Sequence, residues 1–413
     1  MKNIFILFGA TGDLSREKIL PALFSVYKDG SIKDLSIIAV SRRDYTDEDF
    51  REFVRKEAKI SKLNKKDFEK FLETITYTSG TFDDKKLYTK LVEQIPTKSL
   101  VTTYLAIAPQ HFKDVLKKGA QSNLWEKGSH KILLEKPYAE DLTAFKALLK
   151  TIKTYTKNNV LFVDHYLGKA PLYNFVGLRK KNKKLEQYIK NNLEKVVVRL
   201  FEKNDVDRRG DFYNKTGAFV DVGGNHILQI LGQTLAPIEK GKVNVSKLFA
   251  SLYLDKLCSV PWQYEGYHKT PGVAKDSKTE TAFEIFLHSK LPHLKKIPLL
   301  LAGGKGFNKF KSGVDLYFKD GTCIRIGLKP KEEFAGSYGL KRKFAKTKDA
   351  YEYLIESVFS KHYTMFVTQK EIEEEWRIIK EVKDCWKGSH IKTYKRGMQV
   401  PEYDTNHAIW DLL

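Results

Sequence analysis

The chain opens with short apolar runs that alternate with amphipathic stretches, and this alternation is its first structural signal. Runs of strand length and β-rich composition predict strands at Asn3–Phe8, Leu35–Val40, Val101–Ile107, Lys131–Leu134 and Asn159–Val163. Apolar residues recur with helical period between these runs, in Arg16–Lys28, Asp47–Ala58, Lys65–Thr74, Asp84–Gln94, Gln110–Lys118 and Leu142–Thr156. Strands that alternate with helices are typical of βαβ units. We therefore expect a Rossmann-type, doubly wound parallel sheet (α/β) over residues 1–166.

The pattern changes after Leu167, where longer strand-like runs are separated by turn-rich loops. The expected strands of this part are Val196–Phe201, Lys247–Leu252, Thr281–Leu287, Ile297–Ala302, Val314–Phe318 and Cys323–Leu328. A helical region is expected at 348–385. The pattern predicts an α+β domain with a large, mostly antiparallel sheet over residues 167–413. A chain of 413 residues is long enough for two such domains, each with its own core.

Charge changes this picture little, although the formal net charge is +22. A strong positive balance is compatible with binding of nucleic acids, because Lys and Arg neutralise phosphates whatever the base sequence. The basic residues here are mixed with acidic ones, as in the helical stretches 47–73 and 369–387. We therefore expect no nucleic-acid partner, and we expect the positive field to attract small phosphorylated ligands.

The location of the protein is predicted from its apolar runs and cysteines. The run Ile4–Phe8 stops at Gly9, before the length of a secretory signal core, and no stretch approaches the roughly 20 apolar residues of a membrane span. Cys258, Cys323 and Cys385 stand far apart, which suits neither a disulfide framework nor a paired-cysteine metal site. We expect a cytoplasmic protein with no membrane partner and no metal.

A candidate phosphate-binding turn follows the first expected strand. Its residues are Gly9, Ala10, Thr11, Gly12, Asp13 and Leu14. Glycines at the first strand-to-helix turn allow the backbone to approach a pyrophosphate, which the N–H groups of the helix N-terminus then bind. Two glycines alone also fit an ordinary strand-to-helix turn. Their place at the head of an alternating pattern favours a dinucleotide.

The residues after the second expected strand indicate which dinucleotide is bound. An NAD enzyme usually has a carboxylate there for the ribose 2′-hydroxyl, whereas an arginine accommodates the 2′-phosphate of NADP. This chain has Arg42 and Arg43, with no carboxylate before Asp44. A solvated pair of arginines remains the alternative. We expect NADP, because the planar guanidinium can make two charge-assisted bonds to one phosphate.

Four motifs go beyond this general reading, and they occur in a fixed order. They are Gly12-Asp13-Leu14 with Lys18 and Pro21, Glu135-Lys136-Pro137, Asp164-His165-Tyr166-Leu167-Gly168-Lys169, and Asp221-x-x-x-Asn225-His226-x-x-Gln229. Each resembles a motif of the glucose-6-phosphate dehydrogenase family. Weaker similarity continues through Gly304-Lys305 and Asp349-Ala350-Tyr351-Glu352 to Trp376-Arg377. The resemblance therefore covers nearly the whole chain.

The resemblance implies oxidation of D-glucose 6-phosphate at C1 to 6-phospho-D-glucono-1,5-lactone, with hydride transfer to NADP. This reaction is the first step of the oxidative pentose phosphate pathway. The resemblance assigns His226 as the general base and Asp164 as the carboxylate that orients it. A histidine suits the task because its unperturbed pKa of about 6.5 lies near working pH.

The resemblance also assigns the remaining site residues. The substrate phosphate is expected at His165, Tyr166, Lys169 and Lys305, the sugar hydroxyls at Glu202 and Asp221, and the space between sugar and coenzyme at Lys18 and Lys136. Further residues expected at the coenzyme are Pro109, Glu135, Lys136 and Pro137, where Pro137 can follow a cis bond. A homodimer or homotetramer is implied.

Two segments depart from the family pattern, and two other functions remain open. Asp211–Gly217 matches loosely, and Gly223-Gly224 replaces bulkier residues, which predicts a weakened helix start. No second, structural NADP site is expected, because its C-terminal residues have no match. The alternatives are a broader sugar or sugar-phosphate dehydrogenase, which would also oxidise free glucose, and a catalytically inactive basic binding protein, which would bind DNA in a salt-sensitive way.

Overall fold

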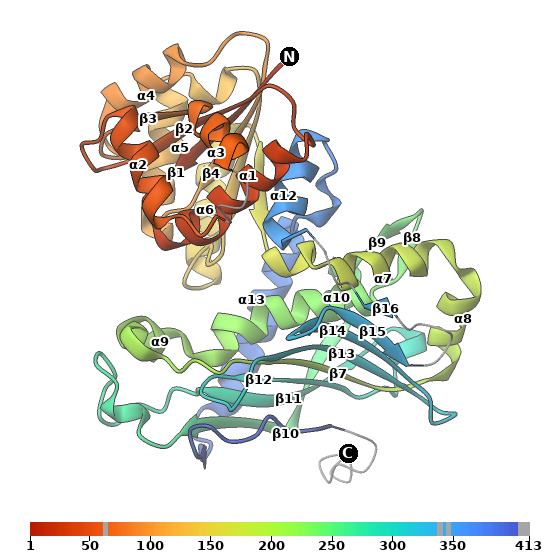
Figure 1. Cartoon of the computed structure of the whole chain (residues 1–413). Helices are drawn as coiled ribbons and strands as arrows, with labels where there is room; N and C mark the ends of the chain where they lie inside the picture. The colour runs from red at the N-terminus through yellow and green to blue at the C-terminus, as the bar shows by residue number, and fades with distance from the viewer. Residues whose placement is uncertain (61–64, 337–341, 344–347, 404–413) are drawn as a thin grey trace. The chain divides into compact units, whose positions relative to one another are not determined.

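A computed structural model describes residues 1–60, 65–336, 342–343 and 348–403 of the chain (Figure 1). The chain divides into two compact units. The first unit contains Met1–Gly168 and Lys348–Thr368, and the second contains Lys169–Thr347 and Gln369–Leu413. The spatial division thus lies close to the expected boundary at Tyr166. It differs from the expected range 167–413 in one respect, because the segment 348–368 packs within the first unit.

The first unit is built on a six-stranded sheet in the order β3-β2-β1-β4-β5-β6. Its strands are β1 (Lys2–Phe8), β2 (Leu35–Ser41), β3 (Ile75–Ser79), β4 (Ser99–Leu105), β5 (Ser129–Glu135) and β6 (Val160–Val163). All neighbouring strands in it are parallel. This is the strand order of the doubly wound dinucleotide-binding fold, so the predicted fold class is confirmed here. The strand β3 was not among the predicted elements.

Helices connect and cover these strands. They are π-helix η1 (Ser15–Ile19), α1 (Leu20–Lys28), α2 (Asp47–Glu57), α3 (Lys65–Glu73), α4 (Lys85–Glu93), η2 (Pro109–His111), α5 (Phe112–Gln121), η3 (Leu124–Glu126), α6 (Leu142–Thr156), η4 (His165–Gly168), α12 (Ala350–Phe359) and η9 (Tyr363–Met365). Helix α12 comes from the distant C-terminal part, and its buried residues Tyr351, Leu354 and Val358 join the core formed by β1, β2 and α1. Capping by Asp349 and Glu352 fixes the start of this helix.

The second unit is built on a nine-stranded sheet in the order β16-β15-β14-β13-β7-β12-β11-β10-β17. Its strands are β7 (Leu193–Phe201), β10 (Leu252–Tyr264), β11 (Ala282–Ser289), β12 (Leu299–Gly304), β13 (Lys311–Phe318), β14 (Cys323–Lys329), β15 (Glu333–Gly336), β16 (Arg342–Lys343) and β17 (Lys392–Tyr394), beside a hairpin of β8 (Ile238–Glu239) and β9 (Lys242–Val243). Only the pairs β7–β12 and β10–β17 of this sheet are parallel, among the described residues. The predicted large, mostly antiparallel sheet is confirmed.

Three helices of the second unit, α7, α10 and α13, lie on one side of the large sheet (Figure 1). The helices of this unit are α7 (Ala170–Lys181), α8 (Lys183–Asn192), η5 (Asp207–Arg209), α9 (Gly210–Ala218), π-helix η6 (Phe219–Ile227), α10 (Leu228–Leu235), α11 (Val245–Ser251), η7 (Tyr267–Lys269), η8 (Pro292–Leu294) and α13 (Gln369–Trp386). The prediction of a strand at Lys247–Leu252 is wrong, because this segment forms most of helix α11. The Asn244 side chain accepts a hydrogen bond from the Lys247 N–H and caps the helix.

Candidate active site

The turn after β1 is shaped by a glycine that no other residue could replace without strain. Gly9 has φ +75°, and a Cβ at this position would lie 2.2 Å from the Ala106 carbonyl oxygen that follows β4. The Gly12 N–H donates to the Gly9 carbonyl at 2.9 Å, and the Ser15 hydroxyl donates to the same oxygen at 2.9 Å. The turn follows β1 and touches the segment after β4, so it lies between the two strands at which the strand order reverses. Doubly wound sheets bind their ligands at this place.

Beside this turn lies a cleft of about 620 Å³, wholly within the first unit. Thr11, Asp13, Arg43, Tyr45 and Phe53 contribute to its walls. Asp13 is exposed and forms an ion pair with Arg16 one helical turn later, at 3.0 Å. Both arginines are exposed, and Arg43 lines the predicted coenzyme cleft whereas Arg42 does not.

Other predicted coenzyme residues follow β4 and β5. Pro109 begins the short helix η2 beyond the end of β4. The Glu135 carboxylate, at the end of β5, accepts hydrogen bonds from the hydroxyls of Tyr104 and Tyr351, the latter at 3.5 Å. Burial raises the pKa of both tyrosines well above the ordinary value, so both phenols stay protonated and donate. The Glu135 carboxylate is therefore positioned by two tyrosines, and the sequence did not indicate these contacts.

The bond between Lys136 and Pro137 is cis. The next residue, Tyr138, donates its hydroxyl hydrogen to the Val163 carbonyl at 2.8 Å, at the end of β6. Because β5 and β6 are parallel, with Glu135 paired to Val163, the segments that begin at Lys136 and Asp164 leave the same edge of the sheet.

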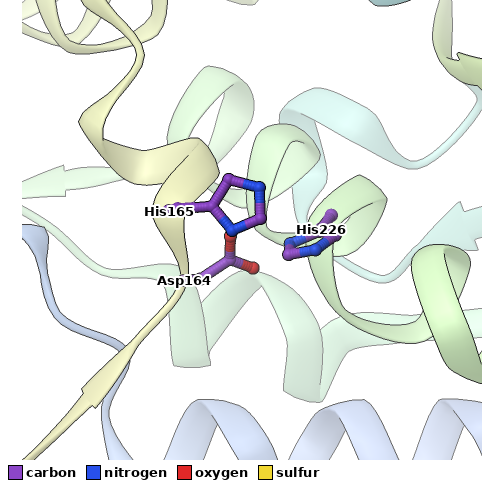
Figure 2. Close-up of side chains that lie close together, drawn as sticks. All are labelled: Asp164, His165 and His226. Atoms are coloured by element: carbon purple, nitrogen blue, oxygen red, sulfur yellow. The ribbon is translucent and has the colours of Figure 1, made fainter. Parts of the chain in front are cut away.

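Asp164 and His165 follow β6 directly, and Figure 2 draws both side chains at the start of helix η4. Asp164 Oδ1 accepts a hydrogen bond from the Tyr166 N–H at 2.9 Å. The His165 ring stacks on Tyr351, with ring centroids 5.6 Å apart, and its Nδ1 lies 3.8 Å from the Glu135 carboxylate. Lys18, on helix η1, forms an ion pair with Asp349 at 3.6 Å.

In the second unit, Glu202 and Lys305 follow two parallel strands that are paired, β7 and β12. The Glu202 N–H donates to the Gly304 carbonyl at 2.8 Å, which fixes the two strand ends side by side. Lys305 Nζ forms ion pairs with the carboxylate of Glu202 and with that of Asp221, the latter at 3.3 Å. The Lys305 side chain is only 8% exposed, so its charge is balanced mainly by these two carboxylates.

Two further residues join this cluster, and neither was predicted. Arg209 Nη2 lies 3.5 Å from Asp221 Oδ1, whereas Lys305 pairs with the other oxygen of the same carboxylate, Oδ2. The Lys305 ammonium lies 5.5 Å from the centroid of the buried Tyr213 ring, within cation–π range. Lys169, the N-cap residue of α7, forms an ion pair with Glu332 at 3.0 Å.

Asp221 and His226 share the π-helix η6, and Figure 2 draws His226 there. In an α-helix, residues five apart differ by about 140° in direction. A π-helix joins residues five apart by its backbone bonds, so it brings such residues nearer to one side. The Asn225 side chain donates to the Val220 carbonyl at 2.7 Å and accepts from the His226 N–H at 2.6 Å. The helix type, which periodicity did not reveal, therefore orients His226 relative to Asp221.

Gly223 and Gly224 have a different role from the predicted weak helix start, because they lie within η6. A Cβ on Gly223 would lie 2.3 Å from the Phe219 ring, and one on Gly224 would lie 2.3 Å from Ile379 of α13. Both glycines are buried, so the missing side chains let η6 pack closely. The prediction of a weakened helix start is corrected accordingly.

The loosely matching segment 211–217 forms most of α9 and ends at Gly217, which has φ +75°. The Glu280 carboxylate lies where a Cβ of Gly217 would be, and it accepts a hydrogen bond from the Phe219 N–H at 3.0 Å. Lys383 balances Glu280 at 3.5 Å. Glu280 therefore fixes the start of the helix that carries Asp221 and His226.

Comparison with known proteins covers almost the whole chain. The family model "Glucose-6-phosphate dehydrogenase, NAD binding domain" matches residues 6–174, and "Glucose-6-phosphate dehydrogenase, C-terminal domain" matches 176–335 and 331–409. The chain belongs to the glucose-6-phosphate dehydrogenase family. Membership makes it a dehydrogenase of this family with an NAD(P)-binding domain, so the predicted family is confirmed.

Individual members of the glucose-6-phosphate dehydrogenase family resemble the chain over most of their length. The glucose-6-phosphate 1-dehydrogenase of Borreliella burgdorferi is 27% identical, over 96% of this chain and 95% of its own. The cytoplasmic isoform of Solanum tuberosum is 26% identical, over 96% and 89% respectively. A solved glucose-6-phosphate dehydrogenase in complex with its substrate glucose-6-phosphate has a TM-score of 0.88 at 24% identity, over 97% of this chain and 96% of that one. The last comparison shows that the fold is shared.

Proposed function

We propose that the protein oxidises D-glucose 6-phosphate at C1 to 6-phospho-D-glucono-1,5-lactone and transfers the hydride to NADP. The observation that carries the proposal is the cluster of Lys305, Glu202 and Asp221 at the ends of two parallel strands, in a chain of this family. A sugar phosphate presents both anionic oxygens and hydroxyl groups. A lysine beside two carboxylates offers a cation for the former and acceptors for the latter.

The first unit fits a dinucleotide at the turn Gly9, Ala10, Thr11, Gly12, Asp13 and Leu14. The close approach at Gly9 leaves room for phosphates beside the backbone, and the cleft beside it contains Thr11 and Arg43. We assign the 2′-phosphate to Arg43, with Arg42 as a second cation near it. NADP, when bound, supplies the hydride acceptor.

The proposed chemistry removes one proton and one hydride from the sugar. His226 takes the proton of the C1 hydroxyl as general base, while the hydride leaves C1 for the nicotinamide. Asp164 accepts a hydrogen bond from the imidazole and stabilises the imidazolium that forms. The oxygen of the hydroxyl becomes the lactone carbonyl, and the proton on His226 passes to solvent.

The remaining assignments position the sugar phosphate. We propose that His165, Tyr166, Lys169 and Lys305 bind the phosphate, and that Glu202 and Asp221 bind sugar hydroxyls. Lys18 and Lys136 lie between sugar and coenzyme in this scheme, and Pro109, Glu135 and Pro137 support the nicotinamide side. Glu135 acts there through its hydrogen bonds with Tyr104 and Tyr351.

The proposed setting is the cytoplasm, and the proposed assembly is a homodimer or homotetramer. None of the helices in the described part of the chain combines the length and apolar character that a membrane span requires. Light scattering after size-exclusion chromatography measures the assembly, and a monomer would contradict it.

The test is an absorbance assay for NADPH or NADH with each combination of glucose 6-phosphate or glucose, and NADP or NAD. We expect a kcat/KM for glucose 6-phosphate with NADP at least about 100-fold above that for glucose, because charge-assisted contacts to the phosphate contribute about 3 kcal/mol. Comparable rates with both sugars would favour the broader sugar dehydrogenase. No reduced coenzyme from any combination would contradict the proposal.

A further inference from the structure

The turn after β2 carries Arg42 and Arg43, and hydrogen bonds from three elements hold it. Tyr77, on strand β3, donates its hydroxyl hydrogen to the Arg43 carbonyl oxygen at 2.6 Å. The same hydroxyl lies 2.9 Å from the hydroxyl of Ser41, the last residue of β2. Ser41 Oγ also accepts from the Arg43 N–H at 3.3 Å and from the Thr11 hydroxyl at 3.3 Å.

These groups form one closed network. Since the Tyr77 proton is directed to the Arg43 carbonyl, Ser41 supplies the hydrogen between the two hydroxyls. Ser41 Oγ then accepts twice and donates once, which uses the full capacity of a hydroxyl. Burial raises the pKa of Tyr77, so the phenol remains a donor at neutral pH. The network links the peptide group of Arg43 to the phosphate-binding turn through Thr11.

The Tyr77 ring is held independently of its hydroxyl. It stacks on Phe50 of α2, with ring centroids 5.0 Å apart and an interplanar angle of 22°. Its backbone N–H donates to the Asp47 carboxylate at 2.7 Å. A phenylalanine at this position would therefore keep the packing and lose only the hydroxyl contacts.

The Arg43 side chain is also oriented by its surroundings. Its Nη1 donates to the Tyr45 hydroxyl at 3.0 Å, and its guanidinium carbon lies 5.6 Å from the centroid of the Phe53 ring. The guanidinium thus faces the cleft that Thr11, Tyr45 and Phe53 line. Its direction depends on the backbone from which it extends, and that backbone is fixed by Tyr77.

We propose that Tyr77 is a positioning residue for coenzyme selectivity, whose hydroxyl holds the Arg43 backbone so that the guanidinium meets the 2′-phosphate. The inference rests on the proposed use of NADP. Tyr77 itself touches no part of the coenzyme in this scheme. It acts through Arg43, and its effect is confined to ligands that carry the 2′-phosphate.

The test compares Tyr77→Phe with the matched control Tyr88→Phe in the full-length protein. Tyr88, on α4, also donates its hydroxyl hydrogen to a backbone carbonyl, that of Phe82 at 2.7 Å, but it does not line the cleft. KM and kcat are measured with NADP and with NAD. Calorimetry measures the affinity for adenosine 2′,5′-bisphosphate and for adenosine 5′-phosphate, which differ by the 2′-phosphate alone and require no turnover.

For Tyr77→Phe we expect the KM for NADP and the Kd for the bisphosphate to rise roughly fivefold, as the loss of one hydrogen bond implies. The KM for NAD, the Kd for adenosine 5′-phosphate and kcat should stay within about twofold of wild type, and Tyr88→Phe should change none of these by more than the error of about twofold. Ser41→Ala, which removes the neighbouring link, should shift selectivity in the same direction and provides the second variant if Tyr77→Phe folds poorly.

The controls distinguish failure of this inference from failure of the proposed coenzyme. If wild type prefers NADP and Arg43→Ala removes the preference, while Tyr77→Phe and Ser41→Ala retain it, the positioning role is overturned and NADP use stands. Equal losses with NADP and NAD would also overturn the role, since they indicate a structural effect only. If wild type binds both coenzymes equally, the proposed 2′-phosphate site fails, and the inference fails with it.

Discussion

Replacing Lys305 by methionine should separate the two roles of its ammonium group, one in stability and one in substrate binding. The side chain is 8% exposed and lies between Glu202 and Asp221, whose side chains are 24% and 13% exposed. Methionine preserves most of the volume and removes the charge. The two partly buried carboxylates then lose the cation that lies between them, although Asp221 keeps its contact with the exposed Arg209 at 3.5 Å.

The magnitude follows from this geometry. Removing one partner of a buried pair costs about 3–5 kcal/mol, and the partial exposure of Glu202 reduces the expected loss of unfolding free energy to about 2–3 kcal/mol. The double variant Lys305→Met/Glu202→Gln should recover part of this loss, because one unpaired carboxylate is gone. The KM for glucose 6-phosphate should rise about 10- to 150-fold in Lys305→Met, since a charge-assisted hydrogen bond contributes about 1.5–3 kcal/mol, and at least as much in the double variant, which also changes the proposed sugar ligand Glu202.

Urea unfolding and steady-state kinetics measure the two effects separately. The control is Lys247→Met, which breaks a comparable pair with Glu239 at 2.5 Å, but with side chains 50% and 41% exposed. This exposed pair should contribute less than about 1 kcal/mol, with no change in KM. The reasoning is refuted if Lys305→Met is as stable as the control variant and binds glucose 6-phosphate as tightly as wild type.

Two other predictions concern stability. Gly217→Ala should lower the unfolding free energy by about 2–4 kcal/mol, because alanine is strained in the left-handed region and its Cβ would displace the Glu280 carboxylate. Urea unfolding measures this loss, and a loss below about 0.5 kcal/mol would contradict the prediction. His130, buried on β5 and bonded to Thr103 at 2.8 Å, has its pKa lowered by burial to about 4. Because the unfolded state binds the proton more readily, stability should fall by about 3 kcal/mol as pH drops from 6.5 to 4. His130→Gln should flatten this part of the pH profile, and an unchanged slope would exclude His130 as its cause.

The sequence predicted most of the first sheet, because β1, β2 and β5 each contain a continuous apolar run of strand character. It missed β3, whose sequence Ile-Thr-Tyr-Thr-Ser is mostly polar, as suits a strand at the edge of a sheet. It assigned Lys247–Leu252 to a strand because a run of this length is ambiguous, and the capping residue Asn244 was the overlooked signal. The helical period at 348–385 was visible in the sequence. An apolar helix face does not show which sheet it packs against, so the position of α12 in the first unit could not be predicted.

The candidate site shows the same limit. The family resemblance suggested Glu202, Asp221, His226 and Lys305 as candidates, since each stands at a strand end or in a distinctive spacing. Local sequence gives no sign of the tertiary partners that fix them. The tyrosines that hold Glu135, the π-helical form of 219–227 and the Glu280 carboxylate that caps it depend on residues brought together from distant parts of the chain.

The central claim is that the imidazole of His226 is the base, and His226→Asn tests it most directly. The control is His288→Asn, because His288, on β11, has a carboxylate partner, Asp255 at 3.1 Å, and is not among the proposed site residues. We predict that kcat for His226→Asn falls by about 10²–10⁴, as expected for loss of general base catalysis, with the Kd for glucose 6-phosphate within about threefold of wild type. A kcat for His226→Asn within a few-fold of that for His288→Asn would contradict the account and require another base.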